Sequence, residues 1–219
     1  MDNVALAALA ATVLSALQLM PQLARSMRLS STVGLSMTWA ALGVLLNVGW
    51  VAYRSSQQLW VSVASPVIAA VLYLALLALV MRTDAMRLSF YLVLGAAASS
   101  IGLAGLAGGW SLVGTTLGLW GGVQVAPAVW SAFRTGPILA IAPTLWIVGL
   151  AQGTLWGYFG YAKADTAFVL YGVAMGTGSL AILLRYAALN RIFLGGRLRR
   201  SGLRVTRAVQ QVATAALRR

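Results

Sequence analysis

Few side chains in this sequence can do acid–base or nucleophilic chemistry. It contains no His and no Cys, and its only carboxylates are Asp2, Asp84 and Asp165. The absence of His and Cys excludes imidazole and thiol nucleophiles, Cys/His zinc sites and disulfides. Three carboxylates also offer few possible pairs for acid–base catalysis. The sequence therefore predicts that the protein is not an enzyme and that it uses no metal or cofactor.

Two tryptophans are the best candidates for holding a small solute. Trp50 and Trp156 each lie near the end of a long apolar run, and a flat indole can stack on the apolar face of a sugar ring or another small polar molecule. Amide side chains lie one helical turn before them, at Asn47 and Gln152. Two alternatives stay open, because Trp also anchors helices at membrane surfaces and amides also join helices by hydrogen bonds.

The elements that must position these side chains are membrane helices. Of the 219 residues, 60% are hydrophobic and 9% are charged, which leaves too few polar side chains to cover a soluble globule. A membrane span needs about 20 apolar residues, so we expect an all-α membrane protein with seven transmembrane helices. Their predicted ranges are 4–24, 36–53, 59–81, 88–107, 111–133, 138–161 and 166–189.

The basic residues collect on one side of the predicted helices. The net charge is +13, and eight of the 16 Lys and Arg residues lie in the range 191–219. The loops of the opposite side hold only Arg54 and Lys163. Because basic residues are retained in the cytoplasm, we expect a multi-pass inner (plasma) membrane protein with its N-terminus outside and its C-terminus in the cytoplasm.

An internal repeat is visible when the chain is shifted by 106 residues. The shift superimposes several chemically distinctive residues, namely Gln18 on Gln124, Pro21 on Pro127, and Trp50 on Trp156. It spans an even number of predicted helices, so the two copies have the same orientation. We therefore expect two parallel three-helix repeats joined by a linker helix. The expected units are 1–83 for the first repeat, 84–110 for the linker helix, 111–190 for the second repeat and 191–219 for a tail.

Several short motifs resemble the PQ-loop family, which includes the SWEET and SemiSWEET sugar transporters. They are QLMPQ at 18–22, Ser30 and Ser31, GLS at 34–36 and WVAY at 50–53. The likeness covers about residues 4–190, but the second repeat has Pro127-Ala128 where the family has Pro-Gln. It implies the layout of a full-length SWEET. KDEL receptors and lysosomal amino-acid exporters are similar in architecture, so the family alone does not fix the substrate.

The resemblance also points to a position in the third helix of each repeat. Family members commonly place a sugar-binding asparagine there, and the matching positions in this sequence are Ser65 and Tyr171. Both retain a hydroxyl group that can donate and accept a hydrogen bond, although their reach differs. The predicted substrate-binding residues are therefore Trp50, Trp156, Ser65, Tyr171 and Asn47.

Two prolines are predicted to bend the helices that would move. Pro21 and Pro127 each remove one backbone hydrogen bond from a predicted span, and Gln22 is a polar side chain beside the first of them. One bend in each repeat suits alternating access by two rocking bundles. A static kink is the alternative reading, because membrane helices tolerate proline without any hinge motion.

The predicted function is a facilitative, bidirectional carrier of a small neutral polar solute, with sugar favoured. No Asp, Glu, His or Lys lies in the middle of a predicted span, so the sequence offers no group for proton coupling. The nearest alternative is an exporter of amino acids or other small solutes, although a charged substrate needs a buried countercharge that the sequence does not reveal. A PQ-loop receptor or assembly factor that does not transport is the other alternative.

The sequence of the tail 191–219 predicts contact with the membrane surface. Val205, Val209 and Val212 fall on one helical stripe among arginines, which is typical of a basic amphipathic helix lying on the anionic inner leaflet. Disorder is the alternative. Nucleic acid is not expected as a partner, because no aromatic residue beyond Phe193 is interleaved with the arginines. A homo-oligomer is compatible with the sequence.

Overall fold

The computed structural model describes residues 2–20, 23–24, 27, 36–82, 87–134 and 143–189. All the regular structure in these ranges is helical. The helices are α1 (Asn3–Gln18), α3 (Met37–Ser56), α4 (Trp60–Val80), α5 (Leu88–Arg134), α6 (Pro143–Lys163) and a last helix, Thr166–Leu189.

The prediction of seven separate transmembrane helices is wrong. The described part of the chain holds six helical elements, and three of them are long and apolar enough to cross a membrane. These three are α4, residues Leu88–Trp130 of α5, and Thr166–Leu189. The layout of two three-helix repeats with a separate linker helix is therefore corrected as well, although the all-α class agrees with the structure.

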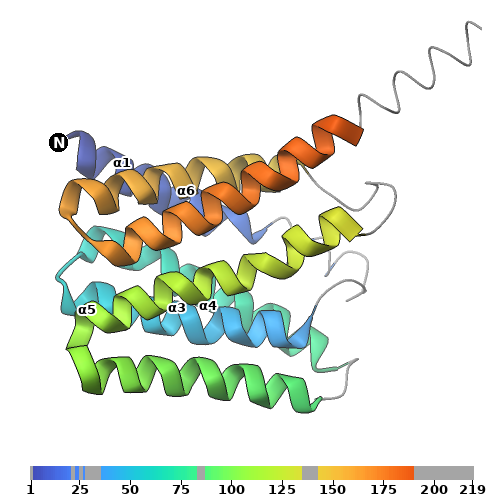
Figure 1. The fold of residues 1–219 in the computed structure, drawn as a ribbon, viewed down its shortest axis with the longest axis horizontal. Coiled ribbons are helices and arrows are strands. Elements are labelled where there is room, and N and C mark those ends of the chain that lie inside the picture. Colours follow the sequence, from blue (N-terminus) through green and yellow to red (C-terminus); the bar gives the residue numbers. More distant parts are fainter. Residues whose placement is uncertain are drawn as a thin grey trace, which may run out of the picture.

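The error arises at Gly108 to Trp110, which had the composition of a loop. The expected helices 88–107 and 111–133 are joined without a loop in α5, which consists of two helices that meet at a kink at Gly109, with φ 61° and ψ −152°. Figure 1 shows that the two arms of α5 fold back beside each other at this point. The indole Nε1 of Trp120 donates to Ser100 Oγ at 2.9 Å and joins the two arms.

Side-chain caps explain where several helices begin. Asp2 accepts from the backbone N of Ala5 at 2.7 Å before α1, and Ser36 accepts from Trp39 N at 3.3 Å before α3. The last helix begins after Asp165, which accepts from Ala167 N at 3.0 Å. Such caps satisfy backbone donors that have no partner within the helix, so the polar residues between the apolar runs mark the ends of helices correctly.

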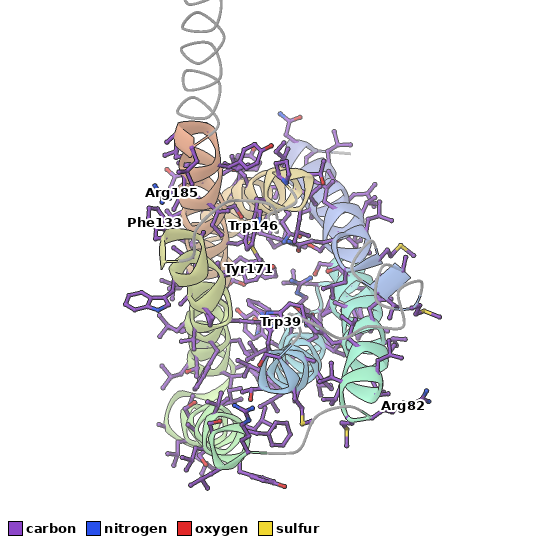
Figure 2. The ribbon with its side chains drawn as sticks, turned by 90° about the vertical axis from the view of Figure 1, so that its right-hand side faces the viewer. Trp39, Arg82, Phe133, Trp146, Tyr171 and Arg185 are labelled. Atoms are coloured by element: carbon purple, nitrogen blue, oxygen red, sulfur yellow. The ribbon has the colours of Figure 1, made fainter. Side chains whose placement is uncertain are left out.

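The helices surround a common interior and present an apolar outer surface. α1 packs against α4 and α6, and α3 packs against α4 and α5. Figure 2 shows the helices nearly end-on, with the first arm of α5 on the outside of the bundle. Many large apolar side chains face outward, including Leu106 at 87% exposure. A surface of this kind suits contact with lipid and supports a membrane location in general terms.

Glycines allow α6 and the last helix to approach at backbone distance. A Cβ atom added at Gly172 would overlap the backbone of Gly157 and Gly153, and one added at Gly153 would come within 2.6 Å of Gly176 N. Small residues at membrane helix crossings commonly permit such contact. In the first arm of α5, by contrast, a Cβ atom at Gly95 or Gly102 would meet nothing within 4 Å.

Replacing Gly172 by Ala is expected to destabilise the protein by about 1–3 kcal/mol, because the added methyl group has no room against backbone atoms. The matched control is Gly176→Ala in the same helix, where a Cβ atom would meet nothing within 4 Å. The control should be neutral or raise the midpoint temperature, since Ala favours helix over Gly by about 1 kcal/mol. Thermal unfolding of the purified protein in detergent measures both, and equal midpoints for the two variants would contradict the predicted crossing.

Candidate functional site

A cavity of about 70 Å³ lies in the interior of the bundle, and each of the six helical elements contributes to its lining. All five predicted substrate-binding residues line it, namely Asn47, Trp50, Ser65, Trp156 and Tyr171. Figure 2 shows Tyr171 on the inner side of the last helix, directed toward the space that the helices enclose. Residues that are far apart in the sequence therefore form one site.

The two predicted tryptophans belong to the interior and not to the lipid-facing surface. Trp50 is 4% exposed and Trp156 is fully buried, whereas Trp60 is 66% exposed. The Trp156 indole Nε1 donates to Ser15 Oγ of α1 at 3.0 Å. These two residues are therefore not anchors at the membrane surface, a role for which Trp60 is better placed.

Arg54 is the main feature of the site that sequence reasoning missed. It was expected in a loop on the outer side, but it lies in the last turn of α3 and is only 4% exposed. Its guanidinium carbon lies 4.4 Å from the ring centroid of Trp156, 5.1 Å from that of Trp50 and 4.9 Å from that of Phe168. Three aromatic rings thus surround the cation, in the geometry of cation–π attraction.

Hydrogen bonds hold one edge of the Arg54 guanidinium. Nη1 donates to the backbone oxygen of Ser62 at 2.6 Å and to Ser65 Oγ at 2.9 Å. Nε is buried without a hydrogen-bond partner in the described structure. Ser65 therefore has a clear role in the site, which is to fix the arginine from the first turns of α4.

No carboxylate of the described ranges forms an ion pair with Arg54. Asp165 lies on the same side of the bundle, but both of its carboxylate oxygens accept from the Tyr53 hydroxyl at 2.9 Å, and Oδ1 also accepts from Ala167 N. The charge on Arg54 is thus stabilised by aromatic faces, by neutral acceptors and, from beyond ion-pair distance, by Asp165. A sequence signal for this arrangement exists, because Trp50 and Arg54 are four residues apart and share a helix face.

Three amide side chains, those of Gln18, Asn47 and Gln124, line the cavity, and Gln152 is not among the lining residues. Asn47 donates to Gly43 O of its own helix at 2.8 Å, and Gln124 donates to the Tyr73 hydroxyl at 3.2 Å. Gln152 is fully buried and donates to Gln18 Oε1 at 2.6 Å, so it joins α6 to α1. The alternative reading of these amides, that they link helices, is thus observed for Gln152 and not for Asn47.

The predicted hinge residues do not belong to this cavity as far as the structure describes them. Pro21 and Gln22 lie outside the described residues. Pro127 lies within α5 on an exposed face, and α5 continues past it to Arg134. The tail 191–219 also lies outside the described residues, so the predicted membrane contact of that segment stays a prediction.

Acidic and metal-ligating side chains do not gather anywhere in the described ranges, where no group of three or more His, Cys, Asp or Glu residues is close enough to hold a metal ion. The cavity therefore offers a cation, hydroxyl groups, amides and aromatic rings. Such groups bind and orient a small polar molecule, and they include no evident nucleophile with an adjacent base.

No family model matches this chain, and no curated protein matches it. The likeness to PQ-loop proteins therefore stays a resemblance carried by the short motifs quoted above.

The Gln18–Gln152 hydrogen bond is expected to couple α1 and α6 energetically. In a double-mutant cycle with Gln18→Ala and Gln152→Ala, we expect a coupling energy of about 0.6 kcal/mol, which is typical of hydrogen bonds between membrane helices. Unfolding of the purified single and double variants measures it. The pair Gln18→Ala with Thr154→Ala is the control, because Thr154 Oγ1 bonds within its own helix to Leu150 O. Additive effects in both cycles would contradict the predicted bond.

Proposed function

We propose that this protein is a membrane transporter, a facilitative and bidirectional carrier that binds a small polar solute in the central cavity and exposes it alternately to the two sides. The observation that carries the proposal is the polar cavity itself, which lies inside a bundle with an apolar outer surface and receives residues from each of the six helical elements. Polar and charged groups inside a membrane protein are costly and commonly serve a solute pathway.

The form of the cavity supports a carrier that must change shape during its cycle. Its volume of about 70 Å³ is below the range of about 300–1,000 Å³ that is usual for ligand pockets. A solute of the size of a sugar therefore needs the helices to move apart before it can enter. In an alternating-access cycle such movement accompanies every binding and release step.

Two classes of solute remain candidates. The PQ-loop resemblance favours a sugar as the solute. The hydroxyl group of Tyr171 and the amide groups of Asn47 and Gln124 can form hydrogen bonds with sugar hydroxyls. An amino acid or another small charged solute is favoured by a different observation, the buried cation of Arg54, which provides the countercharge that the sequence did not reveal. A receptor or assembly factor of the same architecture, which binds a solute without moving it, is the rival from another class.

Uptake of radiolabelled solutes by proteoliposomes tests the carrier function. We expect wild-type protein to equilibrate a transported solute, and Trp156→Ala to slow uptake by about tenfold, the effect of losing roughly 1.4 kcal/mol of solute binding. Trp60→Ala is the matched control, because Trp60 is exposed and does not line the cavity. Binding without any uptake across a panel of sugars, polyols and amino acids would favour the receptor instead.

Transport is expected to be independent of a proton gradient. The residues that line the cavity include no Asp, Glu or Lys, and the chain contains no His, so the described lining has no group suited to carry a proton through the cycle. An imposed pH gradient should change solute uptake by proteoliposomes no more than it changes uptake by protein-free liposomes. Concentrative uptake that needs the gradient and the protein would contradict this prediction.

A further inference from the structure

Arg54 forms no ion pair with a carboxylate of the described ranges, although Asp165 lies near enough to interact with it electrostatically. The side chain is almost fully buried and lines the cavity, yet Nη1 has only a backbone oxygen and a hydroxyl as acceptors. Neither Nε nor Nη2 donates to any residue that the structure describes. A buried charge without a counterion is costly, and membrane proteins retain such groups chiefly where they bind a ligand or an ion.

We propose that the solute carries a carboxylate group, which binds in the cavity against the free side of the Arg54 guanidinium. Arginine pairs with carboxylates through several parallel N–H donors, and such charge-assisted bonds are among the strongest hydrogen bonds in proteins. This inference rests on the proposed carrier function, because it names the class of solute that the same cavity receives.

The cavity suits an organic monoanion better than an inorganic or multiply charged one. It contains one cation and no second basic residue in its lining, so a single negative charge balances it. Leu46, Ala69 and Met175 form apolar parts of the wall, while Tyr171 and Gln124 offer neutral polar groups. A carboxylate on a short organic chain can use both kinds of surface, whereas a bare halide ion has no apolar part to place against the apolar wall.

The aromatic residues around Arg54 acquire a specific part in this arrangement. Trp156 and Phe168 lie 5.1 Å apart between ring centroids, and together with Trp50 they face the guanidinium. When no solute is bound, these rings hold the cation in place. The free energy of burying the cation is lower against aromatic rings than against aliphatic side chains. Since Ser62 and Ser65 fix Nη1, the free nitrogens keep a constant direction, which reduces the cost of ordering the arginine on binding.

The test compares acetate with its neutral counterpart acetamide. Full-length protein purified in detergent is heated with sodium acetate, with sodium chloride at equal ionic strength, or with acetamide. We expect acetate to raise the midpoint of unfolding of the wild type beyond chloride, and acetamide to leave it unchanged, because only a ligand that binds the folded state stabilises it. This comparison needs no variant, so it remains informative if substitution of Arg54 prevents folding.

Variants assign the effect to Arg54. Arg54→Met should weaken acetate binding by about tenfold or more, which is the usual cost of losing a charged hydrogen bond. Arg54→Lys should bind more weakly than wild type but better than Met, because it keeps the charge and loses the fork of donors. Arg82→Met is the control, since Arg82 is exposed at the end of α4 and points away from the bundle in Figure 2.

The possible outcomes separate this inference from the carrier function. Equal stabilisation by acetate and chloride overturns the inference that the solute binds Arg54 through a carboxylate. A response to acetate that survives in Arg54→Met overturns it as well. Uptake of sugars but not of carboxylates or amino acids by proteoliposomes also overturns it and leaves the carrier standing. Acetate binding that depends on Arg54, together with no uptake of any solute, retains the carboxylate site and overturns the carrier.

Discussion

The burial of one guanidinium inside the bundle, near the end of α3, is the constraint on which the site depends. A cation removed from water must recover its solvation from fixed groups, and Arg54 does so from the rings of three aromatic residues and from two acceptors on α4. The rings come from α3, α6 and the last helix, so one charge draws four elements together. These groups do not neutralise the positive charge of Arg54, and the cavity lies beside that charge.

The outer surface of the molecule differs from that of a soluble protein, although most of its buried residues are apolar in the usual way. Large apolar side chains face outward, while serine, glutamine and tyrosine side chains bond to one another in the interior. Since lipid offers no hydrogen bonds, polar groups gain by facing inward, and close crossings such as that of Gly153 and Gly172 supply the packing. The same rule favours binding groups in the interior, which lipid does not reach.

The sequence predicted much of the site and less of the layout. Periodicity alone does not identify interior residues here, because every face of these helices is apolar, but the coincidence of Trp50 with Trp156 pointed to the interior correctly. Arg54 was misplaced because a lone arginine near a helix end usually reaches water. The corner at Gly109 was read as a loop between two helices, since composition does not reveal that a single residue can turn the chain.

The side-chain hydrogen bonds between α1 and α6 constrain the order in which the protein folds during its synthesis. Ser15 and Gln18 belong to a helix that leaves the ribosome before α6, and their partners Trp156 and Gln152 follow more than a hundred residues later. Until α6 is inserted, α1 must keep these polar groups in water, at the lipid headgroups or against the insertion machinery. The early helices are therefore not a finished module, because α1 completes these polar contacts only after α6 has been synthesised.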